Sequence, residues 1–279
     1  MPKLLFSLLA FLLFSLLAFL WVAGPASATL LELKGDFVQG GLVLGRTDPA
    51  TKIRLDGRPV AVTPDGRFVM GFGRDALETA TFQSVAADGK QLVRKLKIRK
   101  RKYRIQRIDG LPSKMVTPSP AALQRIRAEG KVIRDARATF TPVAHFAGGF
   151  IWPARGRISG AYGGQRILNG KPRRPHLGID IAAPTGTQVV AAAPGRVTLA
   201  NRDMYFTGGT VIIDHGHGLS TVYSHLSAID TKVGQMVKQG EGIGKVGSTG
   251  RSTGPHLDWR VNWFQERLDP SLLVGPMRK

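Results

Sequence analysis

The stretch HLGIDIAAPTGT, residues 176–187, decides the fold of the C-terminal half of the chain, because its first part has a strand pattern. Side chains two or four residues apart on an extended strand point to the same face. His176 and Asp180 therefore share one face, and the apolar residues between them face the core. Further strands are predicted at residues 188–192, 195–200, 209–214, 221–224 and 258–263. With hairpin turns between these strands, the pattern predicts an antiparallel β domain.

A second pair of a histidine and a carboxylate lies in HLD, residues 256–258. On a strand, His256 and Asp258 share one face and Leu257 packs behind them. Two such strands side by side would bring imidazoles and carboxylates together. The chain contains no Cys, which excludes disulfides, thiolate zinc sites and cysteine nucleophiles. Imidazole and carboxylate are the zinc ligands that remain.

An ordered series of motifs runs through residues 156–270. Its members are SGAYGGQR (159–166), HLGIDIAAPTGT (176–187), APGRV (193–197), HGHGLSTVYSHL (215–226), GQMVKQGEGIGKVGSTG (234–250) and TGPHLDWRV (253–261). The series resembles the LytM/lysostaphin-type zinc metallopeptidases, which cut peptide cross-links of peptidoglycan through a metal-activated water. The resemblance implies a metalloendopeptidase with Zn²⁺ as its cofactor and peptidoglycan stem peptides as its substrate.

Site residues follow from the same resemblance. It implies that His176 and Asp180 bind zinc, and that His225 and His256 are catalytic, polarising the water and stabilising the oxyanion. The family has a third histidine ligand where this chain has Asp258. A carboxylate can replace it, although one histidine with two carboxylates would leave a Zn²⁺ site formally neutral and a weaker Lewis acid. Arg260 shares the strand face of Asp258 and could pair with it instead.

Two functions therefore remain open. The first is an active zinc endopeptidase. The second is a catalytically degenerate LytM-type domain that binds peptidoglycan or activates a partner cell-wall amidase. His176, Asp180, His225 and His256 favour the enzyme, whereas Asp258 and Arg260 favour the silent domain.

Two further groups of residues lie near these motifs. His215 and His217 have the spacing of a metal pair, but they match a structural hairpin of the family and are interpreted as structural. A cationic group precedes His176, and it is either a solvated loop or a grip for carboxylates of stem peptides. Its members are Arg166, Lys171, Arg173 and Arg174.

The first 28 residues are interpreted as a secretory signal peptide. Lys3 precedes an uncharged apolar run at residues 4–24, and Ala26-Ser27-Ala28 is a cleavage signal. The run is also long enough to remain as an uncleaved membrane anchor, which is the alternative. Either way, the rest of the chain is predicted to be exported, to the periplasm or the medium.

The exported part is predicted to be mainly β and to have three regions. Residues 29–110 alternate short apolar stretches with Asp-Gly turns, which predicts an immunoglobulin-like β-sandwich. Residues 111–149 are predicted to be a linker with a helix ending at Ala138, because Ser119 suits the N-cap and Pro120 the first helical position. Residues 150–279 form the predicted peptidase domain.

The net charge is +21, from 40 Lys and Arg against 19 Asp and Glu. The densest stretch runs from Arg94 to Arg107, with a break expected near Lys100 if it is a strand. Such a stretch attracts polyanions. In an exported protein these would be anionic envelope polymers or lipid rather than nucleic acid; the alternative is a solvated strand that leads into a linker.

Overall fold

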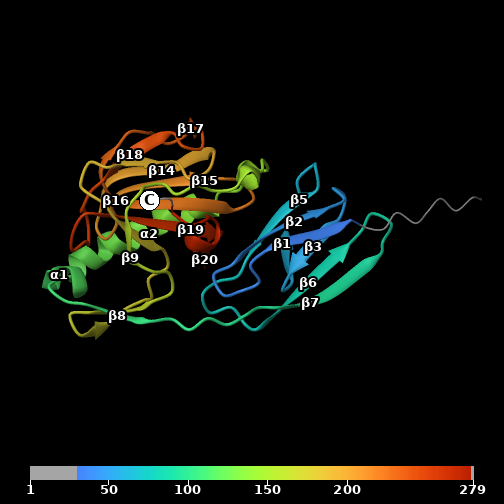
Figure 1. Ribbon diagram of the computed structural model, residues 1–279, viewed down its shortest axis with the longest axis horizontal. Helices are drawn as coiled ribbons and strands as arrows, with labels where there is room; N and C mark the ends of the chain where they lie inside the picture. The colour runs from blue at the N-terminus through green and yellow to red at the C-terminus, as the bar shows by residue number, and fades with distance from the viewer. Residues whose placement is uncertain (1–29, 278–279) are drawn as a thin grey trace, which may run out of the picture.

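The computed structural model describes residues 30–277, so the predicted signal peptide at residues 1–28 lies outside the described residues. Figure 1 shows two β-rich units, of which the N-terminal one holds the earlier strands and the C-terminal one most of the later strands. The prediction of a mainly β fold is confirmed. Within the described part of the chain, no helix is both long enough and apolar enough to cross a membrane.

The N-terminal unit consists of two antiparallel sheets. One contains β1 (Leu31–Gly35), β2 (Leu42–Thr47) and β5 (Arg67–Gly71), and the other contains β4 (Arg58–Val60), β3 (Lys52–Leu55), β6 (Thr79–Val85) and β7 (Gln91–Lys97). The rings of Phe68 and Phe82 stack across the two sheets, with centroids 6.2 Å apart, and both are fully buried. Asp56 and Gly57 form the β3–β4 turn with φ of 48° and 76°, as a two-residue hairpin requires. These features fit the predicted sandwich.

The basic tract is divided between the two units. Its first part lies in β7, on which only Leu96 is buried, and Arg99 forms an isolated bridge with Val38. β7 ends at Lys97, three residues before the break expected near Lys100, and the chain continues past the Arg99 bridge to β8 (Ile105–Ile108). β8 pairs in parallel with β10 (Gln165–Leu168), which in turn pairs with β11 (Lys171–Pro172). The predicted 29–110 domain therefore ends in a strand that belongs to a sheet of the C-terminal unit.

The linker contains two helices and a 3-10 turn. They are α1 (Ser113–Val116), α2 (Pro120–Ala138) and η1 (His145–Gly148). The Ser119 side chain accepts a hydrogen bond from the Ala122 N–H, so α2 begins at the predicted cap. Ala136 of α2 packs against Leu199 and Ile212 of the C-terminal sheet, which fixes the helix on one face of that sheet.

The C-terminal unit is a ten-stranded sheet with a short 3-10 turn at its end. The order of its main path is β17 (Met236–Val237), β14 (Gly195–Met204), β15 (Gly208–Asp214), β16 (Leu219–Ile229), β19 (His256–Trp263), β12 (Ile179–Ala182) and β9 (Arg157–Gly160). β13 (Gln188–Val190), β18 (Gly242–Val246) and β20 (Glu266–Leu268) pair beside this path, and η2 (Pro270–Leu272) follows. All pairs in this sheet are antiparallel, as predicted.

The two units share a continuous core. Buried apolar residues from both form one cluster. At its edge, Nη1 of Arg101 lies 2.7 Å from a carboxylate oxygen of Asp269, which is only 2% exposed at its side chain. The Asp269 N–H also donates to the Gly40 carbonyl at 2.8 Å. The N-terminal unit is thus attached to the end of the C-terminal sheet.

Candidate active site

Three neighbouring strands present the predicted site residues. β16 and β12 lie on either side of β19, with Ser224 opposite Asp258 and Asp180 opposite Asp258 in register. His225 follows Ser224, and His176 comes three residues before β12. The structure therefore brings together the side chains that the two His–carboxylate motifs predict.

His176, Asp180 and Asp258 converge on one point. One possible ligand atom from each lies within 4.8 Å of those of the other two, and all three residues are buried. Nε2 of His176 lies 3.0 Å from Oδ1 of Asp180, yet neither atom has a hydrogen-bond partner. Buried polar atoms without partners are costly in a folded protein. One imidazole and two carboxylates are a donor set that suits zinc, so these residues fit the predicted metal.

Each carboxylate of this cluster also pairs with an arginine. Nη2 of Arg166 lies 2.6 Å from Oδ2 of Asp180, and Arg260 donates to both oxygens of Asp258, with its Nε 2.8 Å from Oδ1. Burial acts to raise the pKa of Asp180, but His176 and Arg166 outweigh it and hold the pKa below its ordinary value. Burial likewise acts to raise the pKa of Asp258, and Arg260 holds it well below. Both side chains are therefore carboxylates at neutral pH.

His225 and His256 form the second half of the site. Their ring centroids lie 4.7 Å apart, and Nε2 of His256 is 3.8 Å from Oδ1 of Asp180. Nδ1 of His225 is 2.7 Å from the Thr249 carbonyl, and Nδ1 of His256 is 2.8 Å from the Gly254 carbonyl. Burial lowers the pKa of His225 to about 4 despite the nearby Asp258, so this ring is neutral at pH 7.

A pocket of about 160 Å³ opens onto these groups. Asp180, His225 and His256 line it together with Ser159, Arg166 and Thr253, which also lie within the quoted motifs. The remaining lining residues lie outside these motifs, namely Gln106, Ile108, Leu111, Leu168, Arg251 and Ser252. Ile108 and Leu111 belong to the segment between the units, and no pattern in the sequence links that segment to the site. Arg251 and its neighbours could have been found, because they directly precede the motif that contains His256.

Three of the four residues in the cationic group before His176 make contacts within the protein. Arg166 lies on β10 and is held by Asp180. Lys171 donates to Oγ1 of Thr117, and Nη2 of Arg173 donates to the Val116 carbonyl at 2.8 Å. The contacts of Lys171 and Arg173 fasten the linker to the C-terminal unit, whereas Arg174 is exposed.

His215 and His217 make protein contacts through both ring nitrogens. Those of His215 lie 2.6 Å from the Pro194 carbonyl and 2.7 Å from Oγ1 of Thr221. Those of His217 lie 3.1 and 3.2 Å from the carbonyls of Ala61 and Pro142. Neither histidine belongs to the metal cluster found in the described residues, in agreement with their structural interpretation.

We expect His215 to make the stability of the protein depend on pH. Burial lowers the pKa of His215 to about 4, whereas a histidine in the unfolded chain titrates at about 6.5. Below about pH 6.5 the unfolded chain binds a proton that the folded chain does not, so the free energy of unfolding falls as the pH drops towards 4. The contribution is on the order of 3 kcal/mol. In urea unfolding over this pH range, the free energy of unfolding should depend less steeply on pH in His215→Gln than in the parent. An equally steep dependence in both proteins would contradict the prediction.

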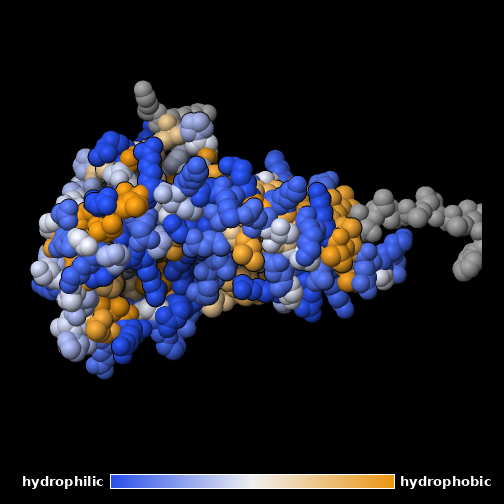
Figure 2. Space-filling model, turned by 90° about the horizontal axis from the view of Figure 1, so that it is seen from below, coloured by the Kyte–Doolittle hydropathy of each residue, from blue (hydrophilic) through white to orange (hydrophobic). Residues whose placement is uncertain are grey.

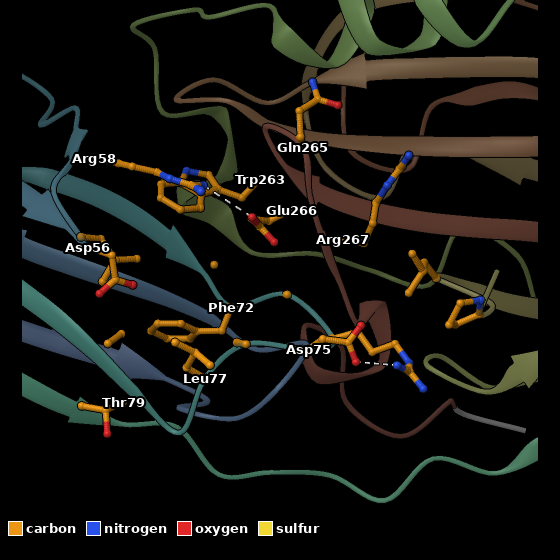
Figure 3. Close-up of a pocket in the computed structure, with 18 residues that line it drawn as sticks. Asp56, Arg58, Phe72, Asp75, Leu77, Thr79, Trp263, Gln265, Glu266 and Arg267 are labelled. Atoms are coloured by element: carbon orange, nitrogen blue, oxygen red, sulfur yellow. Dashed lines mark hydrogen bonds and ion pairs between the residues drawn. The ribbon is translucent and has the colours of Figure 1, made fainter. Parts of the chain in front are cut away.

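A larger pocket, of about 450 Å³, lies between the two units (Figure 3). Asp56, Arg58, Phe72 and Leu77 line it from the N-terminal unit, and Trp263 faces them from the C-terminal unit. It contains no histidine and none of the converging ligand atoms. The pocket is therefore separate from the candidate site.

Similarity to known proteins extends over both units. Residues 174–270 match the family model described as Peptidase family M23. The fold resembles the crystal structure of a protein from Pseudomonas aeruginosa assigned to peptidase M23, with a TM-score of 0.67 and 30% identity. That match covers 85% of this chain and 95% of the other, so it includes strands of the N-terminal unit as well.

Three curated relatives match parts of the chain. DD-carboxypeptidase/endopeptidase Mpg of Neisseria meningitidis is 52% identical over 103 residues, 37% of this chain and 24% of the relative. Peptidoglycan DD-endopeptidase ShyA of Vibrio cholerae is 45% identical over 87 residues, 31% and 20% respectively. Cell division protein DipM of Caulobacter vibrioides is 33% identical over 164 residues, 58% and 25%. The chain matches a quarter or less of the length of each.

The match to the family model and the match to the solved structure indicate the same family. The family match begins two residues before His176 and ends after β20, so it contains all five predicted site residues. The structural match extends the likeness to nearly the whole length of the solved protein. The chain belongs to peptidase family M23, as the order of its motifs predicts.

Proposed function

We propose that the protein is a zinc-dependent endopeptidase that hydrolyses peptide cross-links of peptidoglycan. The observation that carries the proposal is the convergence of His176, Asp180 and Asp258, in which both ring nitrogens of His176 and Oδ1 of Asp180 are buried without a hydrogen-bond partner. Three protein ligands and an open position are typical of catalytic zinc sites. Relatives named peptidoglycan DD-endopeptidase and DD-carboxypeptidase/endopeptidase support this class of substrate.

The three converging residues would hold the metal, and His225 and His256 would move protons. Zinc, when bound there, would lower the pKa of a water ligand and polarise the scissile carbonyl. In the hydrolysis, the oxygen of water bonds to the carbonyl carbon, the carbon–nitrogen bond breaks, and the leaving nitrogen takes up a proton. The protein must therefore accept one proton near the carbonyl and deliver one to the nitrogen.

His225 and His256 have the tautomers needed for this transfer. A carbonyl oxygen can only accept, so Nδ1 carries the hydrogen in both rings, bound to Thr249 in one and Gly254 in the other. Nε2 of His225 is then a free base, because the ring is neutral at pH 7. An imidazole in this state can take a proton from water, and its protonated form can pass a proton to the leaving nitrogen.

The site keeps positive charge although Asp258 adds a second carboxylate, because two arginines lie beside the carboxylates. The sequence alone suggests a formally neutral zinc site, with two carboxylates against Zn²⁺. Arg166 and Arg260 add two positive charges, so the cluster of four side chains has a formal charge of −2 + 2 = 0 before the metal binds. With Zn²⁺ the charge becomes +2, which favours the negative charge that develops on the scissile carbonyl.

A catalytically silent domain that binds peptidoglycan or activates an amidase is the second candidate. It is favoured by the two hydrogen bonds from Arg260 to Asp258, because they occupy the oxygens that a metal would use. One relative is also named a cell division protein rather than a peptidase. Zinc bound per chain after dialysis, with cleavage of cross-linked muropeptides, separates the candidates. About one zinc with cleavage supports the enzyme; no zinc uptake and no cleavage support the silent domain.

We expect His256→Ala to reduce cleavage of cross-linked muropeptides about 100-fold while zinc content stays near that of the parent. His256 lies beside the metal cluster without being one of its three converging ligands, so its loss removes a proton-moving group and not a metal ligand. Measurement of zinc content and kcat on the same sample tests this. Undiminished cleavage would remove His256 from the mechanism.

Export of the protein belongs to the same proposal, because peptidoglycan lies outside the cytoplasm. Figure 2 shows hydrophilic side chains over most of one face of both units. The basic residues Arg94, Lys95 and Lys97 on β7 are exposed, which leaves them accessible to anionic envelope polymers or lipid. Contact with such a partner stays a prediction for the tract Arg94–Arg107.

A further inference from the structure

Arg251 lies on the wall of the candidate pocket, and the backbone fixes its position there. Its N–H donates to the Phe206 carbonyl at 2.9 Å, beside the β14–β15 hairpin. The preceding residue, Gly250, has a φ of 70°, and a Cβ on it would lie 2.5 Å from the Gly208 nitrogen. Only glycine therefore allows this segment to approach the hairpin so closely, and Arg251 is held at the pocket as a result.

Few of the donors on the Arg251 side chain are used within the protein. The guanidinium lies 4.3 Å from the centre of the Phe206 ring, and its Nη1 donates weakly to the Met115 carbonyl at 3.4 Å. A guanidinium has five N–H donors, so most of them remain available. Burial, followed by the charge of Arg166, lowers the pKa of Arg251 to about 10. The guanidinium is still charged at neutral pH, but no carboxylate of the described residues pairs with it.

The other two arginines around the site differ in this respect. Arg166 pairs with Asp180 and Arg260 pairs with Asp258. No carboxylate of the described residues forms an ion pair with Arg251; the attraction that it feels comes from the more distant Asp258, which Arg260 already neutralises. Arg251 is thus a half-buried positive charge without an anion, in the same pocket as the catalytic candidates.

We infer that Arg251 binds a free carboxylate of the substrate, on a residue next to the scissile bond. This inference rests on the proposed peptidase function and adds a preference among its substrates. Arg251 lines the same small pocket as Asp180, His225 and His256, so a carboxylate that reaches Arg251 belongs to a residue close to the reacting amide. A guanidinium can bind both oxygens of a carboxylate at once, which fixes orientation as well as position. The enzyme would then prefer peptides with this carboxylate free over those in which it is an amide.

The test compares two forms of one substrate. In the first cross-linked muropeptide the carboxylate next to the scissile nitrogen is free, and in the second it is a carboxamide. We expect the zinc-loaded parent to cleave the free acid with about 10- to 100-fold higher kcat/KM, mainly through a lower KM. Arg251→Ala should bring the ratio of the two substrates close to one, and Arg251→Lys should restore part of it. Arg196→Ala, an exposed arginine of β14, is the matched control and should keep the full ratio.

Each outcome has a defined meaning. If Arg251→Ala slows both substrates equally and the ratio of the parent is retained, Arg251 only supports the groove and the inference is overturned. If the zinc-loaded parent cleaves neither substrate, the proposed peptidase function fails instead. The binding constants of the two muropeptides, measured by calorimetry, then test Arg251 alone. Tighter binding of the free acid by the parent but not by Arg251→Ala supports the carboxylate site, and equal binding overturns it.

Discussion

Replacement of His176 by alanine is expected to reduce muropeptide cleavage about 1000-fold or more and zinc content to near zero. His176 is the only imidazole among the three converging ligands. Its nearest polar neighbour is Oδ1 of Asp180, 3.0 Å from Nε2, and Arg166 still pairs with the other oxygen of Asp180 after His176 is removed. The zinc-free variant should therefore lose mainly packing, about 2 kcal/mol of unfolding free energy. In contrast, added zinc should raise the melting temperature of the parent and should leave that of His176→Ala unchanged.

His145→Ala is the matched control for this experiment. His145 begins η1, is only partly buried, and does not belong to the metal cluster. Its replacement should leave zinc content and cleavage unchanged. If His176→Ala still binds one zinc per chain, the metal lies elsewhere and the proposed ligand set is wrong.

The second large effect is expected from Arg260→Met, which keeps an unbranched apolar side chain but removes the charged guanidinium. Asp258 is 1% exposed and would be left as a buried carboxylate without a counter-charge. Loss of one partner of a buried ion pair costs about 3 to 5 kcal/mol of unfolding free energy. Bound zinc would supply the missing positive charge, so the loss should be clearly smaller in the zinc-loaded protein. Urea unfolding with and without zinc measures both values.

Two further variants make this result specific. Arg58→Met removes one partner of the exposed ion pair with Glu266 and should cost less than about 1 kcal/mol. The double variant Asp258→Asn/Arg260→Met, in which no charge is buried alone, should recover part of the lost stability. If Arg260→Met is equally destabilising with and without zinc, Asp258 does not contact the metal.

Local patterns were sufficient to predict much of this molecule. The helix from Pro120 to Ala138 could be predicted because Ser119 and Pro120 define its start by contacts within a few residues. The approach of Asp180 to Asp258 could be predicted because both lie on neighbouring strands. His176 precedes β12, and its place in the site was predicted from the resemblance of its motif. The competition between Arg260 and a metal for Asp258 was also visible, since the two residues lie two positions apart on one strand.

Other features depend on contacts between distant parts of the chain. Arg166 carries no local sign of its pairing with Asp180, which requires β10 and β12 to lie close together. The same holds for β8, which joins β10 across about sixty residues of sequence and places Ile108 at the pocket. A short basic tract can form either an exposed strand or a linker, and only the neighbouring sheet decides which. Long-range pairing of this kind has no periodic signature in the sequence.

The pairing of β8 with β10 determines where the chain can be divided. A fragment that begins at residue 150, the predicted start of the peptidase domain, would lack β8 and leave one edge of β10 with unpaired backbone groups. Exposed strand edges recruit other chains and promote aggregation. The same fragment would also lose the pocket wall formed by Ile108 and Leu111. A soluble fragment with a complete pocket therefore has to begin before Ile105.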